Sequence, residues 1–156
     1  MSEQKVEQKA EQKTEAPAPK KKTKVLIAVG KRKKAVAKAF IREGKGRIRI
    51  NSKLLDMFEP KYVKMRIKEP VVLAGPYAEK VNIDVIVRGG GIWGQADAAR
   101  TAIGNAFVIW TKDKNLKQTY IDYDRSILIS DARRTEPHKP SRSTAGPRRT
   151  KQQSKR

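Results

Sequence analysis

Residues 81–110 read VNIDVIVRGG GIWGQADAAR TAIGNAFVIW, and this stretch decides the fold. Its first eight residues place Val81, Ile83, Val85 and Val87 in alternation with other side chains, which predicts a β-strand with one face in the core. Three glycines follow. From 92 to 110, small and apolar residues recur at helical spacing. Because alanine and glycine predominate there, we expect this helix to lie close against a sheet.

The residues upstream supply further strands of this sheet. The apolar run 25–29 predicts a buried strand, and 31–34 predicts the basic connection after it. Alternation over 35–42 predicts a second strand. Gly44-Lys45-Gly46 predicts a turn, after which Arg47-Ile48-Arg49-Ile50 alternates charged with apolar residues and predicts a third strand.

Short helical segments are expected between the third strand and residue 81. Asn51 or Ser52 can cap a helix that carries Leu54, Leu55 and Phe58. Pro60 suits the first turn of another helix, which Pro70 should end. A further helix is expected at 115–122. This order predicts an α+β fold, a two-layer sandwich of one mixed sheet with helices on one face.

Charge divides the chain of 156 residues into three zones with a total net charge of +21. Residues 1–24 predict a disordered charged arm, because Glu-Gln-Lys recurs there with almost no apolar residue to bury. Residues 25–130 predict the globular domain. Residues 131–156 hold nine basic and two acidic residues and no large apolar side chain, which predicts an extended basic tail. Such a charge favours a polyanionic partner, and nucleic acid is the commonest.

Other partners and chemistries find little support in the sequence. No run approaches the roughly 18–20 apolar residues that span a bilayer, which argues against a membrane partner. The chain has no cysteine, and its one histidine, His138, lies in a polar stretch beside proline. We therefore expect no metal site, no cofactor, no small-molecule substrate and no enzymatic activity. The absence of cysteine fits a reducing, cytoplasmic compartment.

The glycine motif admits a competing interpretation. Residues 89–94 satisfy G-x-G-x-x-G after a strand and before a helix, as in dinucleotide-binding enzymes. However, the segment after the helix is not a strand that ends in an acidic ribose ligand, and the remaining chain is too short for a doubly wound sheet. Turn geometry explains Gly89, Gly90 and Gly91. Their N–H groups could also bind an RNA phosphate.

The same segment resembles a known family. Residues 89–104 resemble the signature of the small ribosomal subunit protein nine family, with a glycine triplet, then Gln95, then small residues at helical spacing. The opening 29–37, the turn 44–46 with Ile48, Ile50 and Asn51 after it, and the last residues 154–156 are also similar. The stretches around Arg133-Arg134 and Tyr123-Asp124-Arg125 look more like the archaeal and eukaryotic branch.

The resemblance implies a structural, RNA-binding protein of the small ribosomal subunit. It implies a fold like domain two of another ribosomal protein, with a left-handed crossover, and a place in the head of the subunit beside neighbouring head proteins. It also implies that the tail threads through ribosomal RNA and contacts peptidyl-site transfer RNA through Ser154, Lys155 and Arg156. Asn105 departs from the family, because a basic residue is usual there.

The predicted ribosomal RNA contacts follow from charge and from this resemblance. The candidate residues are Lys31, Arg32, Lys33, Lys34, Gly89, Gly90, Gly91, Gln95, Arg133, Arg134, Arg142, Arg148, Arg149 and Lys151. A four-residue charge run can also be a solvated turn, but the net charge favours RNA. Trp93 and Trp110 could stack on bases, although we favour a place in the core. A free nucleic-acid compactor or a basic membrane-surface protein remains the alternative class.

Overall fold

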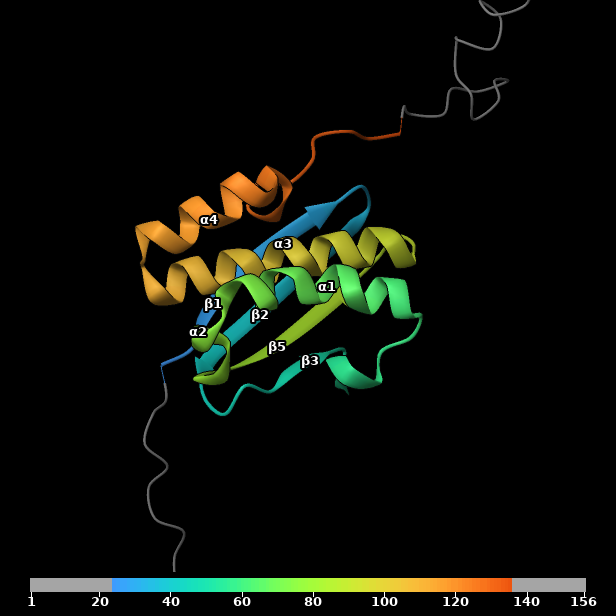
Figure 1. Ribbon diagram of the computed structural model, residues 1–156. Coiled ribbons are helices and arrows are strands. Elements are labelled where there is room, and N and C mark those ends of the chain that lie inside the picture. Colours follow the sequence, from blue (N-terminus) through green and yellow to red (C-terminus); the bar gives the residue numbers. More distant parts are fainter. Residues whose placement is uncertain (1–23, 136–156) are drawn as a thin grey trace, which may run out of the picture.

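The computed structural model describes residues 24–135 as one sheet with helices packed on one face (Figure 1). The strands are β1 (Leu26–Arg32), β2 (Ala35–Glu43), β3 (Ile48–Ile50), β4 (Lys53–Leu54) and β5 (Val81–Arg88). The helices are η2 (Leu55–Met57), α1 (Lys61–Ala74), α2 (Pro76–Glu79), α3 (Ile92–Thr111), α4 (Lys114–Asp124) and η3 (Arg125–Ile127).

The sheet is mixed, with the strand order β1-β2-β5-β3-β4. Strand β2 pairs antiparallel with both β1 and β5, whereas β5 pairs parallel with β3. The predicted α+β sandwich is thus confirmed. Among the strands of residues 24–135, only β3 and β5 run parallel, so a doubly wound nucleotide-binding sheet is excluded.

Where α3 lies on β1 and β2, most side chains of the inner face are small, which lets the helix approach closely. Ala35, Ala37 and Ala39 of β2 are fully buried. On β1, a Cβ at Gly30 would lie 2.1 Å from the carbonyl oxygen of Ala98 and 2.5 Å from the backbone nitrogen of Ala102. Helix α3 therefore lies almost directly on the β1 backbone, as its composition predicted.

Most predicted elements are confirmed, with shifted ends. Strand β1 extends to Arg32, so the predicted connection 31–34 shrinks to the turn Lys33-Lys34. The strands expected at 35–42, 47–50 and around 81–87 are β2, β3 and β5. The helices expected at 92–110 and 115–122 are α3 and α4.

The prediction that Pro70 ends a helix is wrong. Helix α1 continues through Pro70 to Ala74. A proline inside a helix removes one backbone hydrogen bond and its ring crowds the carbonyl four residues earlier. Tertiary packing outweighs this cost in α1. Pro70 is buried, and its carbonyl oxygen accepts a 2.7 Å hydrogen bond from the hydroxyl of Tyr120 on α4. Burial also raises the pKa of Tyr120, which keeps the hydroxyl protonated as a donor.

The prediction that Asn51 or Ser52 caps a helix is also wrong. Both residues have positive φ, 46° and 71°, in the turn between β3 and β4. The Asn51 side chain instead accepts a hydrogen bond from the Val87 N–H at 2.8 Å and donates to the Val87 carbonyl at 3.2 Å. This side chain thereby holds the end of β3 against β5 beyond their last pair, Ile50 with Val85. The segment after β4 is the 3₁₀ helix η2.

Two of the predicted zones fall largely beyond the described residues. The charged arm 1–24 lies outside them except for Lys24, and the basic tail 131–156 lies outside them after residue 135. Within residues 24–135, no helix is long and apolar enough to cross a bilayer.

Candidate nucleic-acid interface

A basic hairpin turn joins β1 to β2 at one end of the sheet. Lys33 and Lys34 form the turn, and Lys33 adopts a left-handed φ of 54°. Lys31, Lys33 and Lys34 are exposed. Within residues 24–135, none of these three lysines has a carboxylate partner within salt-bridge distance, so their charges face solvent.

The glycine loop packs against this hairpin turn. Gly89 and Gly90 have φ values of 76° and 68°, which L side chains rarely adopt. A Cβ at Gly89 would lie 2.7 Å from the Lys34 carbonyl oxygen, and one at Gly90 would lie 3.0 Å from Ala35. Two predicted sites that are more than 50 residues apart in sequence therefore form one surface.

Gln95 closes the glycine loop by a hydrogen bond, whereas Gly91 leaves open space beside it. The Gln95 side-chain amide donates to the Gly89 carbonyl at 3.1 Å, which closes the loop over the first turn of α3. Gly91 precedes the helix, and a Cβ there would meet no atom within 4 Å. The three glycines are exposed beside three lysines, and the backbone at Gly91 has open space around it. Such an arrangement can bind a phosphate by charge and by N–H groups together.

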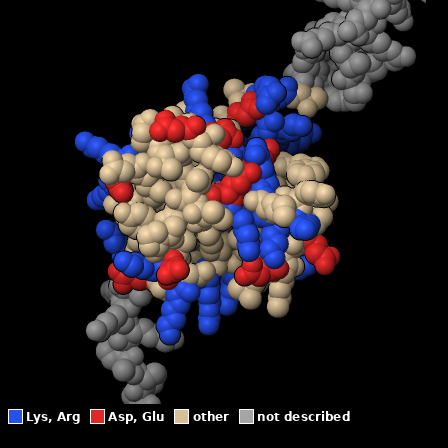
Figure 2. Space-filling view, viewed as in Figure 1, with Lys and Arg blue, Asp and Glu red and all other residues tan. Residues whose placement is uncertain are grey.

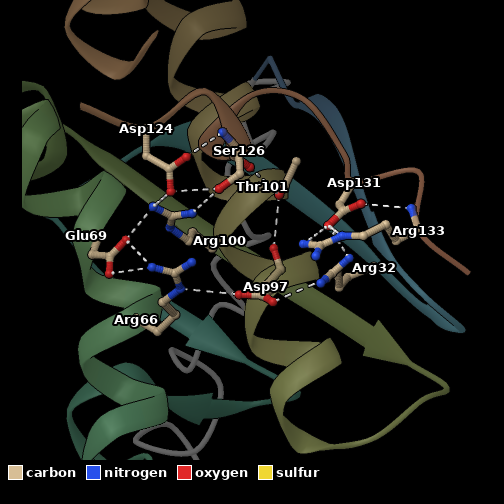
Figure 3. Close-up of polar contacts among 10 residues, drawn as sticks. All are labelled: Arg32, Arg66, Glu69, Asp97, Arg100, Thr101, Asp124, Ser126, Asp131 and Arg133. Atoms are coloured by element: carbon tan, nitrogen blue, oxygen red, sulfur yellow. Dashed lines mark hydrogen bonds and ion pairs between the residues drawn. The ribbon is translucent and has the colours of Figure 1, made fainter. Parts of the chain in front are cut away.

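Arg32 differs from its lysine neighbours because its guanidinium faces inward. Arg32 Nε lies 3.5 Å from Asp97 on α3, and Arg32 Nη1 also contacts Asp131 at the start of the tail (Figure 3). Asp131 in turn accepts hydrogen bonds of 2.8 Å from the backbone and the side chain of Arg133. Arg32 therefore holds the start of the tail, at Asp131, against β1. The sequence did not predict this role.

This contact belongs to an ion-pair network that the sequence analysis missed. Its centre is Arg100 on α3, whose side chain is only 2% exposed. Arg100 contacts Glu69 of α1 and Asp124 of α4, the latter at 2.9 Å, and donates to Ser126 at 2.7 Å. Figure 3 shows Arg100 held between these carboxylates. The network therefore joins three helices to one another.

Arg66 of α1 closes the network on its other side. Its guanidinium lies 3.2 Å from Glu69 and 3.3 Å from Asp97. The groups surround a cleft of about 100 Å³ between β1, the helices and the start of the tail. The network contains four arginines and four carboxylates. They are Arg32, Arg66, Arg100 and Arg133, and Glu69, Asp97, Asp124 and Asp131. Charge in the network is thus balanced.

Two carboxylates of the network have lowered pKa values. Burial alone would raise the pKa of Asp124, but the N–H and hydroxyl of Ser126 and the Arg100 guanidinium outweigh it and hold the pKa at about 2. At Asp131, the side chain and the backbone N–H of Arg133 lower the pKa to about 2. Both carboxylates therefore stay ionised at any physiological pH.

The remaining predicted contact residues lie mostly in the tail. Arg134 is exposed, and the Arg133 side chain is 82% exposed despite its pairing with Asp131. Seven predicted contact residues lie outside the described residues: Arg142, Arg148, Arg149, Lys151, Ser154, Lys155 and Arg156.

The two tryptophans and Asn105 of α3 can each be compared with what the sequence predicted. The preference for Trp93 in the core is wrong, because Trp93 is 61% exposed, whereas Trp110 is partly buried against the core. Asn105 stands where the resemblance expects a basic residue. Its side-chain amide donates to the Leu128 carbonyl at 3.1 Å and helps to hold the segment after η3.

On the helix-covered side, basic side chains lie mostly around the edge of the molecule, with acidic ones among them (Figure 2). Three cations on the opposite face of the sheet were not among the predicted site residues. Lys38, Arg49 and Arg88 point away from the core there. Their signal was present in the alternation of the strands, which assigns every second residue to the outer face.

Comparison with known proteins identifies the family. The family model described as "Ribosomal protein S9/S16" matches residues 30–156. Small ribosomal subunit protein uS9 of Methanococcus maripaludis is 53% identical over 131 residues, which are 84% of this chain and 98% of that relative. The protein of the same name from Methanothrix thermoacetophila is 47% identical over 116 residues, which are 74% of this chain and 88% of that relative. These archaeal relatives agree with the branch that the sequence suggested. The chain belongs to the ribosomal protein S9/S16 family.

Proposed function

We propose that this chain is a structural, non-catalytic constituent of the small ribosomal subunit that binds ribosomal RNA through two basic regions. The first is the surface formed by the hairpin turn and the glycine loop. The second is the tail, residues 131–156. The observation that carries the proposal is the contact between Gly89 and Lys34, which joins exposed lysines and an open backbone within the segment that the family model matches.

The hairpin surface suits phosphate rather than base recognition. Lys31, Lys33 and Lys34 supply mobile positive charge, and the loop 89–91 supplies N–H groups. Contacts of this kind respond to the shape of folded RNA and carry little sequence information. Specificity then comes from the folded RNA and from neighbouring head proteins. No small-molecule substrate, cofactor or membrane has a part in this function.

The tail extends the same electrostatic contact. Residues 131–156 carry nine basic and two acidic residues, a charge that favours contact with RNA phosphates. Arg142, Arg148, Arg149 and Lys151 would neutralise phosphates along the path of the tail. Ser154, Lys155 and Arg156 would contact the backbone of peptidyl-site transfer RNA. If about six tail residues contact phosphates, the log–log salt slope should be roughly −4.

Sedimentation of a gentle cell lysate tests the main proposal. The chain should migrate with small subunits and intact ribosomes in the presence of magnesium. After magnesium removal splits ribosomes into subunits, it should migrate with the small-subunit peak. A free nucleic-acid compactor or a membrane-surface protein would not follow ribosomal particles. Recovery of the chain at the top of the gradient in both conditions would contradict the ribosomal proposal and return attention to the alternative classes.

A truncation tests the transfer RNA contact separately. Removal of Lys155 and Arg156 should weaken peptidyl-site transfer RNA binding, by a similar factor for every transfer RNA, without releasing the chain from the subunit. Substitution of Lys5 and Lys9 in the arm by Gln removes the same charge and is the matched control. Unchanged transfer RNA affinity in truncated subunits would rule out this contact.

A further inference from the structure

The outer face of the sheet, opposite the helices, is uncovered in the described part of the chain (Figure 1). Apolar side chains are exposed on it: Ile27 is 57% exposed, Ile86 46% and Val29 43%. An exposed apolar surface of this kind usually marks an interaction site. Strands β1 and β5, on either side of β2, carry these residues.

The register of the strands shows that cations are interspersed with these apolar residues. Lys38 on β2 lies between Val29 of β1 and Ile86 of β5. In the next row, Val36 lies between Lys31 and Arg88. Neighbouring strands are about 4.8 Å apart, so each of these cations has an apolar residue directly beside it on the next strand.

Charge on this face is strongly unbalanced. Its cations are Lys31, Lys38, Arg42, Arg49 and Arg88, and its acidic residue is Asp84. Asp84 is already bound to Arg42 at 2.7 Å. Within residues 24–135, the other four cations have no carboxylate within salt-bridge distance. The face therefore favours an anionic partner.

Phe40 occupies the middle of the face. It lies between Ile27 of β1 and Asp84 of β5, with Lys38 and Arg42 two residues away on the same strand. Its neighbours Ala39 and Ile41 point into the core, so the phenyl ring lies on the outer side. An aromatic ring on a central strand with cations around it is the arrangement on which unpaired bases stack.

We propose that this outer face is a second RNA-binding surface, on which an unpaired segment of ribosomal RNA stacks a base on Phe40 and places phosphates against Lys38, Arg49 and Arg88. The inference rests on the proposed ribosomal function and adds a contact surface to it. The surface is continuous with the hairpin surface, because Lys31 belongs to both. A neighbouring protein is the competing occupant, and it would have to be acidic.

Photo-cross-linking distinguishes these occupants, because the chain has no cysteine of its own. Val29→Cys and Ile86→Cys place a thiol on each side of Lys38 and keep every cation. Each full-length variant is labelled with a benzophenone maleimide, incorporated into small subunits and irradiated. We expect both positions to cross-link to the same short segment of ribosomal RNA. Cross-links to a protein neighbour would overturn the inference.

The incorporation step keeps the two proposals separate. If the variants and the wild-type chain all fail to enter small subunits, the proposed function fails. If they enter and cross-link to protein, only the outer-face inference fails. Labelling at Lys117→Cys on α4, on the other side of the molecule, should give cross-links to different products. The same RNA segment from that position would also overturn the assignment.

Binding of the full chain to purified small-subunit ribosomal RNA gives a second test. Phe40→Leu should weaken binding about tenfold by loss of stacking, and Phe40→Tyr should retain it. Lys38→Gln with Arg88→Gln should make the log–log salt slope less negative by roughly 1.4. Lys114→Gln with Lys117→Gln removes the same charge from α4. An equal change of slope in that control, or wild-type binding by Phe40→Leu, would contradict the inference.

Discussion

The ion-pair network and the outer face of the sheet use the same residue types for different purposes. In the network, four arginines face four carboxylates, and Arg100 is almost completely buried. On the outer face, four of five cations lack a carboxylate within the described residues, and all are accessible. In a chain with a net charge of +21, a basic residue alone does not identify an RNA contact. The presence or absence of a carboxylate partner is what separates these two groups of cations.

Solvation explains this division. A charge that leaves water must find an opposite charge and hydrogen bonds, because its desolvation costs several kcal/mol otherwise. Arg100 meets this need with Glu69, Asp124 and Ser126. An exposed lysine such as Lys38 stays hydrated and keeps its charge available for a phosphate.

The largest expected effect comes from breaking the network at its centre. Arg100→Met should lower the free energy of unfolding by about 3 kcal/mol, because it leaves Glu69 and Asp124 without their buried partner. Urea denaturation of the full chain measures this change. The triple variant Arg100→Met, Glu69→Gln, Asp124→Asn should recover part of the loss. A loss below about 1 kcal/mol for Arg100→Met would mean that the network contributes little to stability.

A substitution without charge tests the packing on the same side of the sheet. Gly30→Ala should cost about 2 kcal/mol, because its Cβ would overlap the backbone of α3 at Ala98 and Ala102. Gly91→Ala is the control and should change stability by less than about 0.5 kcal/mol, since open space surrounds that position. Urea denaturation compares the two variants. Equal stability of both would show that α3 can move away from β1 at little cost.

Acid should weaken the network before it affects the outer face. The pKa of Asp124 in the folded protein is about 2, below its ordinary value of 3.8. Its contribution to the free energy of unfolding is therefore present above pH 3.8 and is lost as the pH falls toward 2. Asp131 also stabilises the folded state above pH 3.8, and this stabilisation is lost over the same pH range. The loss from Asp124 should be about 1 kcal/mol, because its side chain is one-third exposed and screened by solvent. Denaturation between pH 5 and 2 measures it, and Asp124→Asn should flatten the curve.

The smallest expected effect is on the stability of outer-face variants. Lys38→Gln with Arg88→Gln should change the free energy of unfolding by less than about 0.5 kcal/mol, because neither side chain has an internal partner in the described residues. Any change should be a slight gain, since the variant reduces self-repulsion. Urea denaturation checks this value. A loss as large as that of Arg100→Met would remove the contrast between the two regions.

Much of the fold could be predicted from periodicity. Alternation assigned β2, β3 and β5, and helical spacing assigned α3, because each element buries one face of its own sequence. The glycine triplet was identified as a strand-to-helix turn, and Gly89 and Gly90 indeed have left-handed φ values. Local signals failed at Pro70 and Asn51, where contacts with Tyr120 and Val87 outweigh the usual preferences.

The candidate site was predicted only in part. Composition identified the basic hairpin and the glycine loop as separate features, but their contact at Lys34 required the packing of β5 beside β2. The network was not predictable, because Arg32, Arg66 and Arg100 come from three separate elements and meet only through tertiary structure. No local pattern distinguishes a buried arginine from an exposed one.

The sequence by itself therefore determined the net charge, the helix and strand periods, and the family, since these are local or additive properties of the chain. Tertiary structure alone decided which cations are neutralised. Arg32 and Lys31 are adjacent in sequence, yet one contacts Asp97 and Asp131 while the other remains exposed. Alternate side chains of a strand point to opposite faces of the sheet. Only the packing of α3 and the start of the tail against one of these faces places carboxylates there.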